Sequence, residues 1–86
     1  MNLDNLQEIF IEAEVDKSNF IFVVIDAEST IEIISIPTRS FKKKIEFYLS
    51  AYTYDLRHVM NKDVKIINIT HGTSNELNRL KEDYSL

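Results

Sequence analysis

Residues 20–37 read FIFVVIDAESTIEIISIP, and this stretch decides the fold. From Phe20 to Asp26 it is rich in β-branched and aromatic residues without polar alternation, which predicts a strand covered on both faces. A short turn at Ala27 to Ser29 leads to a second strand from Thr30 to Ile36, which ends at Pro37 because proline has no backbone N–H to donate. We therefore expect a hairpin whose first strand is central in the sheet.

Two of the expected strands change the side on which their apolar residues fall. The second strand shows this slip after Ile33, and a third strand, which begins at Val64, shows it after Ile66. A β-bulge that inserts one extra residue would repair the slip. A sheet with both faces buried would also accommodate it, because apolar residues are then wanted on both sides. The sequence leaves both alternatives open.

Residues 41–60 show the clearest helical pattern of the chain. Apolar residues recur at spacings of three and four, which predicts one helix of some twenty residues, about 30 Å long, capped by Ser40 or Thr38 and ending near Asn61. The recurring residues are Phe41, Ile45, Tyr48, Leu49, Tyr52, Leu56, Val59 and Met60.

Shorter helices are expected at both ends of the chain. The first is predicted to be capped by Asp4 with Gln7 as the reciprocal partner, and to end near Val15. The last follows a turn at His71 and Gly72 and begins at Thr73, with Glu76 completing a capping box.

These elements predict one domain over residues 1–86 of the α+β class. We expect a three-stranded antiparallel sheet in the order 2-1-3, packed by one long helix, with short N- and C-terminal helices. The order along the chain is helix, strand, strand, helix, strand, helix.

The composition excludes several kinds of chemistry. Without cysteine, the chain of 86 residues cannot form disulfides, thiolate metal sites or a thiol nucleophile. Two histidines and a single glycine provide neither metal-ligand spacing nor a glycine-rich phosphate loop, so we expect no metal, no cofactor and no enzymatic activity. The longest apolar run, Phe20 to Ile25, is far shorter than the roughly 20 residues that span a membrane, and the N-terminus carries acids, so we expect a cytoplasmic protein.

Charge is distributed unevenly along the chain. Residues 1–36 contain eight acids and one base, whereas residues 37–65 contain seven bases and three acids. Four bases, Arg39, Lys42, Lys43 and Lys44, surround the start of the predicted long helix, where the helix dipole disfavours cations. Arg39 and Lys42 are therefore candidates for contact with an anion, such as an acidic protein surface, a nucleic-acid phosphate or the acidic first third of this chain. The net charge of −4 makes nucleic acid the weakest of these choices.

The predicted long helix carries a second apolar stripe, roughly 150° from the first. The stripe consists of Phe47, Ala51, Tyr54 and His58, flanked by Lys43, Lys44 and Arg57. Either the first helix or the C-terminal tail covers it, or it forms a contact surface for another protein or for a second copy of the chain. Because aromatic and arginine side chains anchor many interfaces, we interpret these seven residues as a partner-binding surface.

Part of the chain resembles small uncharacterised proteins of phages and prophages from low-GC Gram-positive bacteria. The similarity lies in Pro37, Phe41 to Tyr48 (FKKKIEFY), Leu49, Ala51, Tyr52 and Val64 to Asn68 (VKIIN). The resemblance implies a short acidic protein that binds and blocks a host enzyme or an anti-phage defence protein in the host cytoplasm. It assigns no functional residue.

The sequence thus favours a non-enzymatic protein-binding module that acts as an inhibitor of a host or defence protein. Two other functions stay open. One is a structural homo-oligomer, a homodimer through the long helix, and the other is a nucleic-acid-associated regulator that uses Arg39 to Lys44.

Overall fold

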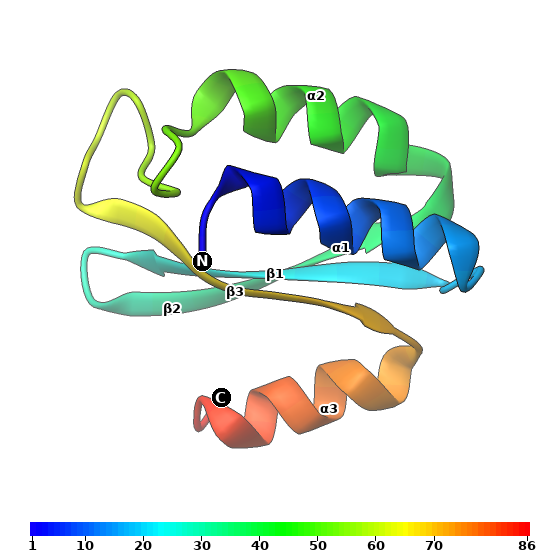
Figure 1. Cartoon of the computed structure of the whole chain (residues 1–86). Helices are drawn as coiled ribbons and strands as arrows, with labels where there is room; N and C mark the ends of the chain where they lie inside the picture. The colour runs from blue at the N-terminus through cyan, green and yellow to red at the C-terminus, as the bar shows by residue number, and fades with distance from the viewer.

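The computed structural model describes residues 1–86 and contains three α-helices and one antiparallel sheet of three strands. The elements are α1 (Leu3–Val15), β1 (Phe20–Ala27), β2 (Thr30–Pro37), the 3-10 turn η1 (Thr38–Ser40), α2 (Phe41–Ala51), β3 (Val64–Gly72) and α3 (Ser74–Asp83). The strand order is β2-β1-β3, with α1 and α2 on one face of the sheet and α3 on the other (Figure 1). The predicted α+β class, antiparallel sheet and strand order are confirmed.

The central position of β1 follows from its composition. All five residues from Ile21 to Ile25 are buried, and they alternate between the two faces of the sheet. Ile21, Val23 and Ile25 join the core beneath α1 and α2, whereas Phe22 and Val24 join a second core above α3. Helices on both faces are therefore needed to cover this strand.

The two strands whose apolar residues change sides in the sequence, β2 and β3, accommodate this change in different ways. The register of β2 with β1 is unbroken from Thr30 to Pro37, so β2 has no bulge and packs apolar residues on both faces. In β3, Ile66 and Asn68 face consecutive residues of β1, so Ile67 is an extra residue and forms a bulge. Each of the two alternatives is thus realised in one strand.

The turn between β1 and β2 consists of Glu28 and Ser29, both in the left-handed region with φ of 53° and 75°. This is the type I′ geometry that two-residue hairpins prefer, although asparagine and glycine usually occupy it. Neighbouring groups hold the turn, because the Ser29 N–H donates to Asp26 Oδ1 at 2.9 Å and Asn61 Nδ2 donates to Glu28 Oε1 at 3.2 Å.

The predicted long helix is wrong in its length. α2 has 11 residues and ends at Ala51, and the longest helix is α1 with 13. Tyr52 is already extended, the Thr53 hydroxyl accepts a hydrogen bond from the backbone N–H of Arg57 at 3.2 Å, and Leu56 has a left-handed φ of 67°. Such local side-chain bonds compete with helix formation, so residues 53–63 form a loop instead.

The N-terminal helix ends at Val15 as expected, but it begins earlier than predicted. Its capping residue is Asn2, whose side chain accepts a hydrogen bond from the Asn5 N–H, while the Asn5 side chain accepts one from the Asn2 N–H. Asp4 and Gln7, the predicted capping pair, lie within the helix. The reciprocal capping interaction exists, displaced by two residues.

The C-terminal helix is capped by Thr73, as predicted, and Gly72 before it has a φ of 154° that favours glycine. The predicted capping box does not form. The Glu76 carboxylate instead accepts hydrogen bonds from Arg79 and, at 3.1 Å, from the hydroxyl of Thr70 on β3. Hydrogen bonding to Arg79 lowers the pKa of Glu76.

Candidate functional site

A shallow groove of about 140 Å³ lies between α1 and α2. Its lining residues are Gln7, Phe10, Ile11 and Glu14 from α1 and Phe41 and Ile45 from α2. The rings of Phe10 and Phe41 meet edge to face with centroids 6.1 Å apart, and both residues are buried. Four of the six lining residues are hydrophobic, so the groove is mainly apolar.

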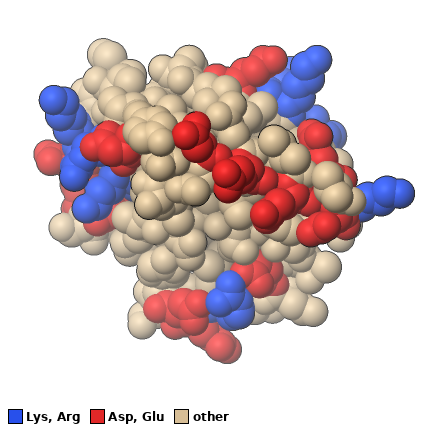
Figure 2. Space-filling view, viewed as in Figure 1, with Lys and Arg blue, Asp and Glu red and all other residues tan.

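The outer surface of α1 combines exposed apolar residues with acids. Ile11 is 61% exposed and Val15 is 74% exposed. The same segment carries five acids, which are Asp4, Glu8, Glu12, Glu14 and Asp16, and no base before Lys17. Figure 2 shows acidic side chains in a row across this face of the molecule. We call Ile11, Val15 and these acids the α1 surface.

The predicted second stripe is divided by the end of α2. Phe47 and Ala51 remain on the helix, and at 100° per residue Phe47 lies on the flank opposite Ile45, which faces α1. Ala51 is partly buried and packs against the large core, so it is not part of an outer surface. Phe47 is 48% exposed, and the Lys44 ammonium lies 5.5 Å from the centre of its ring. Lys43 is exposed on the same flank. We call Lys43, Lys44 and Phe47 the α2 flank.

The remaining residues of the predicted stripe belong to the loop that follows α2. Tyr54 is 59% exposed, and its hydroxyl donates to Asp4 Oδ2 at 3.0 Å, which ties the loop to α1 and raises the pKa of Tyr54. His58 packs edge to face against Tyr52 at 5.2 Å, and its Nδ1 accepts a hydrogen bond from the Met60 N–H at 3.0 Å.

Arg57, the third flanking base of the prediction, also lies in this loop. Its side chain donates to the Lys62 carbonyl at 3.1 Å and lies 3.4 Å from Asp55. The helical stripe predicted from sequence is therefore not one surface, because Tyr54, Arg57 and His58 do not continue α2.

The predicted anion contacts lie where α2 begins. Arg39 is in η1 and Lys42 is in the first turn of α2, and both are exposed. No acid of the chain lies within 4.0 Å of either side chain in an ion pair. The acidic first third of the chain therefore does not neutralise these two bases by direct pairing.

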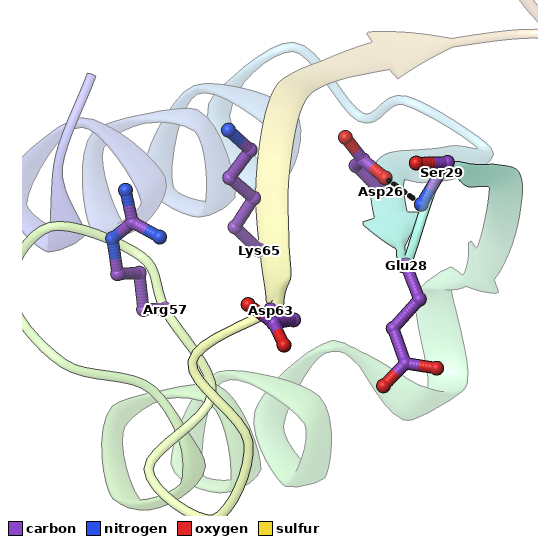
Figure 3. A pocket seen from close by; sticks show the side chains of 6 residues that line it. All are labelled: Asp26, Glu28, Ser29, Arg57, Asp63 and Lys65. Atoms are coloured by element: carbon purple, nitrogen blue, oxygen red, sulfur yellow. Dashed lines mark hydrogen bonds between the residues drawn. The ribbon is translucent and has the colours of Figure 1, made fainter.

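A second pocket, of about 440 Å³, lies at the hairpin end of the sheet and has no hydrophobic lining. In Figure 3, Arg57 and Lys65 lie on one side of it, whereas Asp26, Glu28 and Ser29 belong to the hairpin on the other. Small-molecule sites are mostly apolar with a few polar groups, so this open and fully polar hollow is a poor match for one.

His71 is the one histidine with several polar partners. Its Nδ1 lies 2.7 Å from Ser18 Oγ, and its Nε2 lies 3.5 Å from Glu12 and 3.9 Å from Asp16. The sequence predicts a turn at His71 and Gly72 but not this contact, because Ser18 is 53 residues away and leaves no local signal. Neither pocket is lined by Ser18 or His71, so the geometry favours a tie between the end of α1 and β3.

No group of three or more His, Asp or Glu side chains is placed to hold a metal ion. None of the three helices has the length and apolar character needed to cross a membrane. Comparison with protein-family models, with curated proteins and with solved structures found no match to this chain.

Proposed function

We propose that this chain is a non-enzymatic protein-binding module that holds a segment of its partner in the groove between α1 and α2. The observation that supports the proposal is the combination of an apolar groove with the exposed Ile11 and Val15 beside it. Exposed apolar residues next to a groove mark interaction sites on soluble proteins more often than isolated ones do.

The size of the groove favours side chains over a metabolite. Small-molecule pockets have volumes of roughly 300–1,000 Å³, whereas this groove has about 140 Å³. One or two bulky apolar side chains of a partner helix would fill it, as in other helix-in-groove complexes.

The charge of the α1 surface defines the rest of the partner. Five acids without a compensating base attract lysine and arginine and repel acidic segments. The partner segment therefore combines bulky apolar residues with basic residues. A host enzyme or defence protein with such a segment is the class of target that the resemblance to phage proteins implies, and binding would block that surface.

A random peptide library displayed on phage and selected on the immobilised protein tests this proposal. We expect enrichment of peptides that combine Leu, Ile or Phe with Lys or Arg. Binding should fall at least about tenfold in the double variant Ile11→Ser, Val15→Ser, because the variant removes the apolar contacts beside the groove. Both side chains are largely exposed, so the substitutions should change the stability of the fold little.

Charge variants separate the two parts of the site. Glu8 and Glu14 are exposed and form no ion pair within the chain, so Glu8→Gln and Glu14→Gln should weaken binding and reduce its dependence on salt. Met60→Ser is the matched control for the apolar substitutions, because Met60 is 85% exposed but lies in the loop after α2, and it should leave binding unchanged.

Peptides that bind the Ile11, Val15, Glu8 and Glu14 variants as well as they bind the control would contradict the proposed site.

A further inference from the structure

The two edges of the sheet differ in how they are protected. Along β3, the Ile66 N–H donates to the Leu56 carbonyl at 2.9 Å, the His58 N–H donates to the Val64 carbonyl at 2.8 Å, and the strand has a bulge. Both devices hinder a further strand from pairing with the first half of β3, from Val64 to Ile67. β2 forms the other edge without a bulge, without lysine and with proline only at its last position.

The groups that β2 offers at its edge follow from the hairpin. In a two-residue hairpin the pair next to the turn, here Ala27 and Thr30, is hydrogen-bonded, and bonded and non-bonded pairs alternate from there. The N–H and C=O groups of Ile31, Ile33 and Ser35 therefore point away from β1. No loop or helix of the chain hydrogen-bonds to them.

We propose that the β2 edge pairs with β2 of a second copy of this chain, so that two sheets join into one continuous antiparallel sheet of six strands. The pairing surface consists of the β2 edge and the α2 flank. The proposal is independent of the partner groove, which lies on the opposite side of α2.

The sequence of β2 selects one symmetric register. With Ile33 opposite Ile33 of the second copy, Ile31 faces Ser35 in both halves and about six backbone hydrogen bonds form. A shift in one direction places Glu32 opposite its own copy, which like charges disfavour. A shift in the other direction places Ile31 opposite Pro37, which has no N–H to donate.

The α2 flank supports the same partner. α2 packs over β2 at this edge, so a twofold axis at Ile33 places the two α2 helices next to each other across the seam. Because packed helices need about 8–10 Å between their axes, the twist of the joined sheet must spread them until only their outer flanks meet. Phe47, which is 48% exposed, would then meet its copy.

Charge agrees with this arrangement. Glu32 is exposed on the face of β2 that packs toward α2, and Lys43 and Lys44 lie on the α2 flank. None of the three forms an ion pair within one chain. The seam between two copies therefore gathers unpaired charges of both signs, which favours a second copy over an acidic or a basic partner strand.

Single cysteines test the register directly, because the chain has none of its own. In an antiparallel bonded pair the Cα atoms lie about 5.5 Å apart, a distance that a disulfide spans. The variant Ile33→Cys should therefore form a covalent dimer under mild oxidation at micromolar concentration.

The matched control is Ser35→Cys, on the same edge. Two copies of residue 35 would be offset by four residues, roughly 13 Å, and should not cross-link. The double variant Ile31→Cys, Ser35→Cys should cross-link again, because these positions face each other across the seam. Equal cross-linking of Ile33→Cys and Ser35→Cys, or none in Ile33→Cys, would overturn the proposal.

Sedimentation of the unmodified protein provides the second measurement. We expect a species of twice the chain mass of 10.1 kDa. Ser35→Pro removes one edge N–H donor from each chain, two in the dimer, and none that pairs within the hairpin. Dimerisation should therefore weaken about tenfold or more. The circular dichroism spectrum should stay that of the wild type. A monomer at all concentrations, or a dimer unaffected by Ser35→Pro, would rule out this edge as the interface.

Discussion

The two faces of the sheet are covered by cores of very different size. Thirteen buried residues form one cluster on the face of α1 and α2, whereas the cluster on the face of α3 has three, Phe22, Val24 and Leu80. β1 supplies side chains to both clusters. The difference shows that one central strand can support two layers unequally, and that α3 depends on a single buried side chain of its own, Leu80.

The largest effect is expected from the larger core. Phe10→Ala removes a ring whose centroid lies 6.1 Å from that of Phe41 and 6.4 Å from that of Tyr48. We expect a loss of about 3–5 kcal/mol in the free energy of unfolding, which is most of the stability of a domain of this size. Urea denaturation measures it, and a loss below about 1.5 kcal/mol would show that the two cores are more equal than their burial indicates.

A smaller and more local effect is expected from the other core. Leu80→Ala should cost about 2–4 kcal/mol, because Leu80 is completely buried between α3 and the sheet. Native-state hydrogen exchange should show faster exchange in α3 than in α1, since a layer held by few contacts opens on its own. Equal acceleration in both helices would mean that the two faces unfold as one unit.

The smallest effect is expected on the alkaline stability of the larger core, to which Tyr48 belongs. Burial raises the pKa of Tyr48 well above its ordinary value of 10, and proximity to Tyr52 adds to the shift. A tyrosine whose pKa is raised by folding stabilises the protein fully below pH 10, and this contribution is lost as the pH rises above 10, because only the unfolded chain then ionises. Tyr48 alone should therefore account for a loss of about 1.4 kcal/mol per pH unit above pH 10.

The variant Tyr48→Phe should keep most of its stability in that range, apart from what Tyr52 contributes, whose pKa burial also raises. Thermal unfolding at pH 7 and pH 11 compares the two proteins. An identical alkaline loss in both would place the responsible group elsewhere.

The sheet and its strand order were largely predictable, because a strand that is buried on both faces has an uninterrupted apolar sequence. The uninterrupted apolar run of β1 identified the central strand, and from this the strand order followed. The capping residues of α1 were misplaced because asparagines and aspartate stand close together at its start, and any of them can cap.

The length of α2 could not be predicted from periodicity. Tyr52 and Leu56 continue the spacing of the helix and are buried in the same core, yet neither is helical. An apolar pattern indicates which side chains are buried but not the backbone conformation between them. Here the hydrogen bond from the Arg57 N–H to the Thr53 hydroxyl competes with continuation of the helix. Of the predicted site, Lys43, Lys44 and Phe47 lie together on α2, and their role in partner binding stays a prediction. The groove could not be predicted, because it needs two helices that are far apart in sequence.

The hairpin turn at Glu28 and Ser29 has a consequence for folding kinetics. Two residues other than glycine in the left-handed region cost about 1 kcal/mol each or more, so the isolated hairpin gains little from its own turn. The hairpin is therefore a poor nucleus. Pairing of β3 with β1 must close a loop of some forty residues, so we expect folding to be slower than in a helical domain of the same length.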